Sequence, residues 1–575
     1  MKASMQLKLF LILLLFVGIR YGSLSKDFSC EEPGLVRAAR AIVACGYPLI
    51  YAGETMDFPV VGLSKHPMPA WILAGAFAVF GEDERVARST IALFSLLILY
   101  TIYLFSVRMI PQFGGTKVGL LAAALFALNP FALQNSLMVH YDGSVYAFFV
   151  TAFMFYALWF LARSKRRPWE FVGLAFLASL CFANKIEPTL ICFFVVVLYA
   201  LYPLRDIRLA AGVSVALGFG ILLFMVPYYF YNLLFAHPEA TFWEIKVFFD
   251  QFLGRHFLGG VSRALEGTGP GPLHTGTLLV LGFFSWMIYW GMALLALAVS
   301  CELRGLWPKL WRAELTFEDH TIAFFTYWIG SFILVHFGFG WLGAGYPRYF
   351  GPIVPPTIIL ISLYLVRIGA FEKRNLKCLI PLSLVFPLLY VLFPALTGLR
   401  DYLTRADFFS LMRIPSGVTV ATIYIALGLG GLVGAFVKDR RVLTATATVF
   451  FAFYLGFNAI QLHHDLKADY SLTDMYGVKD SKKVGHYLNG ITGPDDIIIC
   501  EKAVGHYYQK RFYDIAHLTT APGENNFEEV CQNPEVKYLT VSRQMLDQSQ
   551  RRFKSRYFEK PRLVFQSNYE IIRLK

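Results

Sequence analysis

Charged residues are scarce in this sequence, and their scarcity excludes an ordinary soluble globular protein. Asp, Glu, Lys and Arg make up only 16% of the 575 residues, whereas 56% are hydrophobic and the mean hydropathy is +0.52. The eight cysteines form no CxxC pair and no His/Cys spacing typical of a metal site. No internal repeat of the kind found in inverted-repeat transporters is evident. The composition instead predicts a membrane protein.

Long apolar runs are abundant and set the predicted architecture. Each run is near twenty residues, which is enough to cross a ~30 Å hydrocarbon core as a helix. Helices are expected because lipid cannot satisfy the polar groups of an exposed backbone. By this length criterion we predict an all-α polytopic bundle of about thirteen transmembrane helices. The runs lie at residues 5–23, 86–109, 116–134, 142–162, 168–185, 187–203, 208–232, 275–300, 320–341, 348–367, 376–396, 415–437 and 442–462.

Short basic loops predict the orientation of the chain in the membrane. With the N-terminus in the cytoplasm, each connection predicted to lie inside is rich in Lys and Arg, as the positive-inside rule requires. These connections are residues 163–167, 205–208, 304–312, 367–377 and 438–441. The net charge of +13 is then explained by topology and by anionic lipid headgroups, so it indicates no nucleic-acid partner. We predict a multi-pass protein of the plasma (inner) membrane with an extracytoplasmic C-terminal region.

We predict two domains, a transmembrane domain at 1–463 and a soluble extracytoplasmic domain at 464–575. Three stretches of the chain depart from the pattern of membrane span and short loop. The first outer loop, 24–85, carries two helix-like pieces. The Gly- and Pro-rich outer loop 233–274 is predicted as a lid or a plain linker. The tail 464–575 contains the β-rich runs "DDIIICE", "VKYLTVS", "RLVFQ" and "YEIIRL", which predict a small soluble α/β domain that binds the acceptor or stabilises the outer face. Two of its cysteines, Cys500 and Cys531, form either a disulfide or two thiols.

The N-terminal apolar run has two interpretations, a cleaved signal peptide or a retained membrane anchor. No clean small-x-small cleavage site precedes Cys30, which favours the anchor.

Ionisable residues gather at the predicted outer ends of four helix junctions. Charges at that depth are costly unless they are paired or hydrated, so they indicate a functional site. They are Glu31, Glu32 and Lys65 in the first loop, His140 and Asp142 in "LMVHYDGSVYAFF", Lys185 and Glu187 in "CFANKIEPTL", and Arg348 in "GYPRYFGPIVP".

Each of these charges also has a structural interpretation. The acid pair precedes Pro33, a favoured first residue of a helix, and could complement the positive end of its dipole. Asp142 could cap the next span. The cations could snorkel to lipid headgroups or be solvated. All of them fall on one side of the membrane, however, and this favours a common function.

Such a set of residues allows a transfer reaction at the edge of the bilayer. A carboxylate can take the proton from an attacking hydroxyl. Lys and Arg can hold a phosphate leaving group and neutralise its developing charge. The aromatic residues Trp71, Tyr141 and Tyr349 suit a substrate that has a polar head and a lipid tail.

The stretch "EEPGLVRAARAIVACG" resembles the first-loop motif of the GT-C membrane glycosyltransferases. The similar branch is that of the protein O-mannosyltransferases and aminoarabinose–lipid A transferases, in which an Asp-Glu pair opens a juxtamembrane helix. This sequence keeps Glu32, Ala39, Arg40 and Gly46 at matching spacing, with Glu31 in place of the Asp.

Further motifs of that family follow in order. Lys65-His66-Pro67 corresponds to the family's Lys-Pro-Pro element, "GEDERVARSTIALFSLL" to its entry into the second span, and Asp142 to the acid that opens its fourth span. Asn184-Lys185-Ile186 corresponds to its Thr-Lys-Gly turn, and Arg348-Tyr349 with Pro352 to its Arg-Tyr…Pro element.

The resemblance implies inverting transfer of a sugar from a polyprenyl-phosphate-linked donor to a hydroxyl of a lipid, glycan or protein acceptor. Its implied catalytic residues are Glu31 as base and Asp142 as the group that orients the acceptor or shares its proton. Lys65, Lys185 and Arg348 would hold the carrier phosphate. The remaining implied substrate-binding residues are Glu32, His66, Tyr141 and Tyr349.

The sequence indicates no cofactor. Some relatives hold a divalent cation through an acid just before the lysine motif, but Ser64 occupies that position here. Two other classes of function remain as alternatives. One is a transporter or flippase that uses the same charges as a relay, which would place charges deeper in the spans. The other is a receptor or scaffold whose tail binds a partner.

Overall fold

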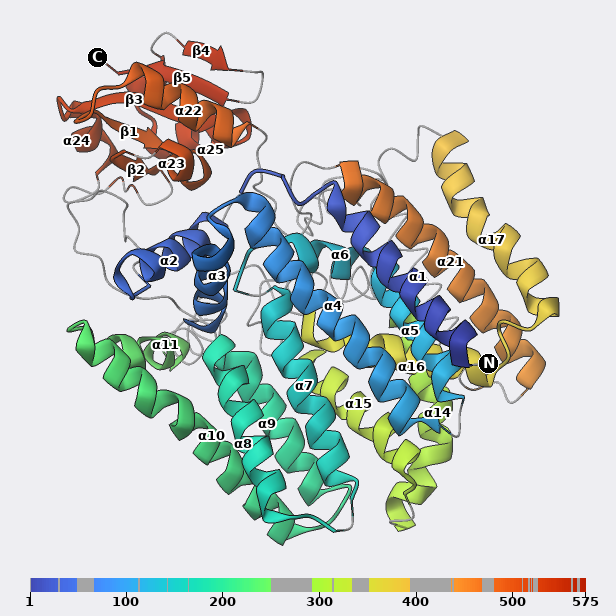
Figure 1. The fold of residues 1–575 in the computed structure, drawn as a ribbon. Coiled ribbons are helices and arrows are strands. Elements are labelled where there is room, and N and C mark those ends of the chain that lie inside the picture. Colours follow the sequence, from blue (N-terminus) through green and yellow to red (C-terminus); the bar gives the residue numbers. More distant parts are fainter. Residues whose placement is uncertain are drawn as a thin grey trace, which may run out of the picture.

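The structure, a computed structural model, is a helical bundle joined to a small C-terminal domain built on a sheet (Figure 1). It describes residues 2–28, 32–48, 67–111, 114–141, 143–163, 165–249, 292–312, 315–333, 351–392, 436, 439–467, 480–508, 510–515, 518, 520, 526–559, 562–565 and 569–574.

Among the described residues, four helices are long and apolar enough to cross a membrane. They are α1 (Lys2–Tyr21), α4 (Glu84–Met109), α7 (Ser144–Leu161) and α10 (Ile207–Leu234). Shorter apolar helices lie beside them: α3 (Pro67–Phe80), α8 (Pro168–Asn184), α9 (Ile186–Leu201), α16 (Val354–Arg367) and part of α21 (Arg440–Lys467). The remaining helices of the bundle region are α2 (Glu32–Cys45), α11 (Ala240–Phe249), α14 (Met292–Arg312), α15 (Phe317–Ile333) and α17 (Lys373–Leu392).

The predicted number of about thirteen spans stays a prediction. Several of the predicted spans, such as 275–300 and 415–437, lie partly or almost wholly outside the described residues.

Residues 116–134, predicted as one span, form a bent pair of helices rather than one continuous helix. Helix α5 (Gly115–Leu128) and helix α6 (Pro130–Leu137) meet at a bend of 63°. The Asn129 side chain accepts a hydrogen bond from the Ala132 N–H at 2.9 Å and so caps α6, whose first residue, Pro130, needs no hydrogen-bond acceptor. The apolar run concealed this break because Asn129 and Pro130 are followed directly by the apolar residues Phe131, Ala132 and Leu133.

Helices α2 and α3 are the two helical pieces predicted in the first outer loop, and they belong to the core of the protein. Leu35, Val36 and Ala39 of α2 pack with Leu73 and Phe77 of α3 in one buried cluster. The same cluster contains Val139, Tyr141 and Val145 from the junction between α6 and α7. The apolar face of α2 is therefore covered by protein.

The C-terminal domain contains a five-stranded mixed sheet in the order β2-β1-β3-β5-β4. Strand β1 pairs in parallel with β2 and β3, whereas β5 pairs antiparallel with β3 and β4. The strands are β1 (Ile497–Cys500), β2 (Phe512–Asp514), β3 (Val536–Ser542), β4 (Arg562–Phe565) and β5 (Tyr569–Arg573). The helices are α22 (Ser481–Ile491), α23 (Lys502–Tyr508), α24 (Phe527–Gln532) and α25 (Arg543–Phe553).

Side chains of β1 alternate between two apolar clusters, one on each face of the sheet. Cys500 lies in the cluster that contains Ile498, and Cys531 of α24 lies in the cluster that contains Ile497 and Ile499. The two thiols are therefore not bonded to each other.

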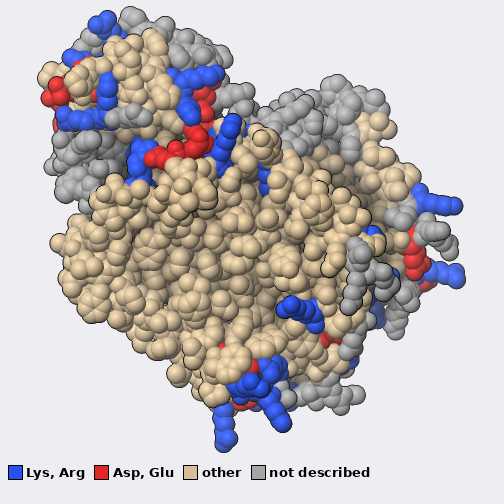
Figure 2. Space-filling view, in the orientation of Figure 1, with Lys and Arg blue, Asp and Glu red and all other residues tan. Residues whose placement is uncertain are grey.

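Charged side chains in Figure 2 gather mainly on the C-terminal domain, at its junction with the bundle, and at the edges away from it, with a broad uncharged area between. We call the end of the bundle that carries the C-terminal domain the upper end, and the opposite end the lower end (Figure 1). The predicted basic connection 163–167, which follows α7, lies at the lower end. The chain turns there between α7 and α8.

Close packing of α8 against α10 depends on a glycine. A Cβ atom on Gly220 would lie 2.5 Å from the carbonyl oxygen of Ala175, whereas a Cβ on Gly218 would meet nothing within 4 Å. We expect Gly220→Ala to force the helices apart and to cost about 1–3 kcal/mol of stability, because backbone atoms cannot yield as a side chain can. Thermal unfolding of the purified protein measures this, with Gly218→Ala as the control in the same helix. Equal unfolding temperatures for the two variants would contradict it.

Candidate active site

An ion pair between α2 and α4 anchors the acid-bearing end of the first loop. Arg88 Nη1 lies 2.6 Å from Glu32 Oε1, and Nη2 lies 2.9 Å from Oε2. Both side chains are buried, with relative exposures of 5% for Arg88 and 2% for Glu32. Two parallel N–H···O bonds of this kind fix direction as well as distance. Helix α2 therefore starts at a defined position on α4.

Glu32 also reaches the next acid-bearing junction. Its Oε1 accepts a hydrogen bond from the Val139 N–H at 2.8 Å. Val139 lies three residues before Asp142, and both Val139 and Tyr141 are buried in the cluster that joins α2 and α3. One carboxylate thus connects the first loop to the start of α7.

Asn135 of α6 connects that junction to the start of α16. Its carbonyl oxygen accepts a hydrogen bond from Ser144 Oγ at 2.9 Å, in the first turn of α7. A Cβ on Gly351 would lie 3.0 Å from Asn135 Nδ2, so the chain just before α16 packs directly on α6. Gly351 lies three residues after Arg348.

Lys185 is buried, with 7% relative exposure, and its backbone is extended between α8 and α9. A row of aromatic rings runs from this turn to the first loop. Ring centroids are 6.0 Å apart for Phe182 and Phe224, 5.0 Å for Phe224 and Tyr228, and 6.0 Å for Tyr228 and Trp71. Trp71 lies near the start of α3, six residues after Lys65.

Of the predicted site residues, the structure describes Glu32, Tyr141 and Lys185. Glu31, Lys65, His66, Asp142, Arg348 and Tyr349 lie outside the described residues. The structure does bring together the described segments that flank these residues. The links are Glu32, Asn135, the aromatic row, and the buried cluster shared by α2, α3 and the start of α7. Within the described part of the chain, no three His, Cys, Asp or Glu side chains are grouped as metal ligands would be.

Arg88 is a site residue that the sequence reasoning did not single out. The available signal was an arginine at the start of an otherwise apolar span, since charges in such segments are rare and tend to be paired. Its partner could not be identified, because Glu32 lies 56 positions away in the sequence.

The C-terminal domain contacts this region through helix α23. The His506 ring packs edge-on against Phe28 at 5.3 Å between centroids. Burial lowers the pKa of His506 well below its ordinary value, and the cations Arg37, Arg40 and Lys482 add to the effect. The imidazole is therefore neutral at pH 7 in the docked structure.

Comparison with known proteins shows which family and which folds this chain is similar to. Residues 64–231 match the family model described as dolichyl-phosphate-mannose-protein mannosyltransferase. The fold is similar to that of ArnT from Cupriavidus metallidurans. The structure of ArnT bound to undecaprenyl phosphate matches with a TM-score of 0.58 and 16% identity, over 99% of this chain and 97% of that chain. The apo structure matches with a TM-score of 0.59 and 16% identity, over 100% and 98%.

A weaker likeness is to the archaeal oligosaccharyltransferase AglB from Archaeoglobus fulgidus. Its TM-score is 0.47 at 12% identity, over 95% of this chain and 70% of that chain. No curated protein matches the sequence significantly.

The chain thus has the fold of the GT-C membrane glycosyltransferases, and the predicted resemblance is confirmed. The family match is confined to residues 64–231, whereas the similarity of fold to ArnT extends over nearly the whole chain.

The buried ion pair yields a stability prediction. Glu32→Gln leaves the Arg88 guanidinium buried without its carboxylate, and breaking such a pair costs about 3–5 kcal/mol. The control is Glu82→Gln, which breaks an ion pair with Arg40 whose side chains are 46% (Arg40) and 31% (Glu82) exposed. Exposed pairs contribute at most about 1 kcal/mol. We expect a much larger fall in unfolding temperature for Glu32→Gln, and equal falls would contradict the role given to this pair.

His506 yields a prediction for pH. Unfolding exposes the imidazole, whose pKa returns to about 6.5. Below that pH the unfolded state binds a proton that the folded state does not, so the free energy of unfolding falls as the pH falls. Burial raises the pKa of Asp27, which has the opposite effect, because the folded state then binds that proton at a higher pH than the unfolded state does; this contribution is common to the wild type and the His506 variant. Unfolding temperatures between pH 7.5 and 5.5 should therefore fall for the wild type and change less for His506→Gln; parallel curves would refute this.

Proposed function

We propose that the protein transfers a sugar, with inversion, from a polyprenyl-phosphate-linked donor to an acceptor hydroxyl at the outer face of the membrane. The observation that carries the proposal is the pair of contacts made by Glu32, to Arg88 and to the Val139 N–H. These contacts hold the segment after Glu31 beside the segment before Asp142, and so support a shared site for the two predicted acids.

In the proposed reaction Glu31 is the general base. Glu32 already binds Arg88 and the Val139 N–H, so we assign the role of base to the adjacent acid, Glu31. Glu31 takes the proton from the acceptor hydroxyl as its oxygen attacks the anomeric carbon. A new carbon–oxygen bond forms there, the bond to the carrier phosphate breaks, and the phosphate leaves with the electron pair. Asp142 orients the acceptor or shares its proton.

Cations from separate junctions are proposed to hold the carrier phosphate. They are Lys65, Lys185 and Arg348, with His66, Tyr141 and Tyr349 beside them. The burial of Lys185 supports this role, because a phosphate in a site of low dielectric favours a cation strongly. The ArnT structure holds undecaprenyl phosphate, a carrier of the proposed chemical type.

The proposed orientation places the upper end outside the cytoplasm. The basic connection 163–167 lies at the lower end, where positive loops remain in the cytoplasm. On this basis the N-terminus is cytoplasmic, the bundle (1–463) lies in the plasma membrane, and the domain formed by 464–575 is extracytoplasmic. The sugar is a hexose or pentose, and the acceptor is a lipid, glycan or protein.

The test is transfer by purified protein in lipid nanodiscs. We would incubate it with a panel of polyprenyl-phosphate sugars and acceptor hydroxyl compounds and detect covalent product by mass spectrometry. Glu31→Gln and Asp142→Asn should each lower transfer by a factor of about 10²–10⁴, as expected for loss of acid–base catalysis, with little change in unfolding temperature.

The matched control is Glu535→Gln, which neutralises an acid of an ion pair with Arg511 at 3.3 Å in the C-terminal domain. It should leave transfer unchanged. Full activity in Glu31→Gln and Asp142→Asn would refute the mechanism. Substrate flux into proteoliposomes without any covalent product would favour a transporter instead.

A further inference from the structure

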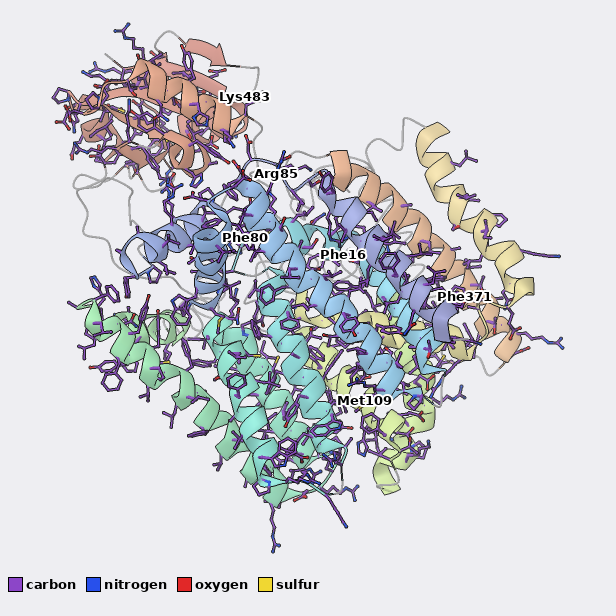
Figure 3. All side chains as sticks on the ribbon, in the orientation of Figure 1. Phe16, Phe80, Arg85, Met109, Phe371 and Lys483 are labelled. Carbon is purple, nitrogen blue, oxygen red and sulfur yellow. The ribbon has the colours of Figure 1, made fainter. Side chains whose placement is uncertain are left out.

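Two side chains of the C-terminal domain meet the start of α4. Lys482 Nζ of α22 lies 2.7 Å from Glu84 Oε1, and the Tyr507 hydroxyl of α23 donates a hydrogen bond to the same oxygen at 3.1 Å. Tyr507 and Glu84 are buried, with 6% and 8% relative exposure. Figure 3 shows α22, where Lys483 is labelled, above the start of α4, where Arg85 is labelled.

The same two residues also hold the chain that leads to α2, Tyr507 through its hydroxyl and Lys482 through its backbone. The Tyr507 hydroxyl accepts a hydrogen bond from the Phe28 N–H at 2.8 Å. The Lys482 backbone N–H lies 3.3 Å from Asp27 Oδ2. The C-terminal domain therefore bonds directly to the two residues that stand four and five positions before Glu32.

Arg88 holds this segment from the other side. Its Nε donates to the Lys26 carbonyl at 3.2 Å, and its Nη2 donates to the Asp27 carbonyl at 2.8 Å. The Phe28 ring lies between the Arg88 guanidinium, 5.6 Å from the ring centroid, and His506. Glu84 and Arg88 are one turn apart on α4, so neighbouring positions of one helix hold the C-terminal domain and the acid-bearing loop.

We propose that the C-terminal domain is a positioning element for the acid pair, and that Tyr507 and Lys482 are its positioning residues. This inference rests on the proposed function. Only three residues separate Phe28, fixed by Tyr507, from Glu32, fixed by Arg88, and Glu31 is one of them. A displacement of a catalytic group by about 1 Å can lower the rate by about 10²-fold. The contacts at Phe28 and Glu32 are therefore close enough to Glu31 in sequence to affect the rate of transfer.

A simple docking role makes a different prediction. Apolar contacts such as Phe28 against His506 would be enough to attach the domain, and loss of one hydroxyl would leave the rate unchanged. In the proposed role that hydroxyl serves two groups at once, the Glu84 carboxylate and the Phe28 N–H. Its removal leaves both without this partner and loosens the chain before α2.

The first experiment compares two adjacent tyrosines of the full-length protein. Tyr507→Phe should lower kcat for sugar transfer at least tenfold with KM for the donor little changed, because the variant misplaces the acid rather than the phosphate site. Amide hydrogen exchange of peptides that cover residues 26–48 should rise. Tyr508→Phe is the control, since its hydroxyl bonds within the domain, to Thr492 Oγ1 and the Asp496 carbonyl, both at 3.1 Å. It should change neither quantity.

The second experiment reverses the charges of the ion pair. Lys482→Glu places two carboxylates together and should lower kcat and raise exchange at residues 26–48. Lys482→Glu combined with Glu84→Lys restores an opposite pair and should recover part of both quantities. Recovery would assign the effect to the opposite charges of this pair rather than to either side chain alone.

Three outcomes would overturn the inference. They are raised exchange with unchanged kcat in Tyr507→Phe, identical behaviour of the Tyr507 and Tyr508 variants, and no recovery in the charge-reversed double variant. If the wild type transfers no sugar from any donor tested, the proposed function fails. The positioning role is then decided by hydrogen exchange alone, and unchanged exchange in Tyr507→Phe would end it.

Discussion

The buried guanidinium of Arg88 is the constraint on which the upper end of this bundle depends. A charge in such a place is tolerated only when its donors are satisfied. Arg88 has five N–H donors, and five acceptors surround it: both oxygens of Glu32 and the carbonyls of Lys26, Asp27 and Leu137. Three stretches of chain, at residues 26–27, Glu32 and Leu137, are thereby bonded to one side chain of α4.

This arrangement gives the two adjacent acids different tasks. The Glu32 carboxylate binds the Arg88 guanidinium and accepts a hydrogen bond from the Val139 N–H, so its task is to hold the chain in place. A base must keep a free lone pair for the substrate and must still be held in place. The proposal therefore combines a fixed acid with a neighbour whose position it determines, and the buried faces of α2 and α3 keep the pair attached to protein rather than lipid.

Much of the fold was predictable because its signals are local. The run "VKYLTVS" coincides with β3, and the apolar run 208–232 lies within α10. The bend after α5 was missed because Asn129 and Pro130 interrupt no apolar pattern, and β2 was missed because three residues carry too little periodicity. Arg88 with Glu32 was beyond prediction for another reason: the pairing depends on how α2 returns to α4, which no local pattern contains.

The remaining junctions are joined by contacts of different kinds, and this bears on how the site is built. Asn135 ties α7 to the chain before α16 by a hydrogen bond and close packing, whereas rings from Phe182 to Trp71 tie the turn at Lys185 to α3. The aromatic row does not involve Arg88. The Asn135 link does, because Asn135 lies on α6, whose Leu137 carbonyl accepts a hydrogen bond from Arg88. The row of rings ends on α3, which packs with α2 and the start of α7 in one buried cluster. That cluster therefore joins the turn at Lys185 to the chain that flanks the two proposed acids.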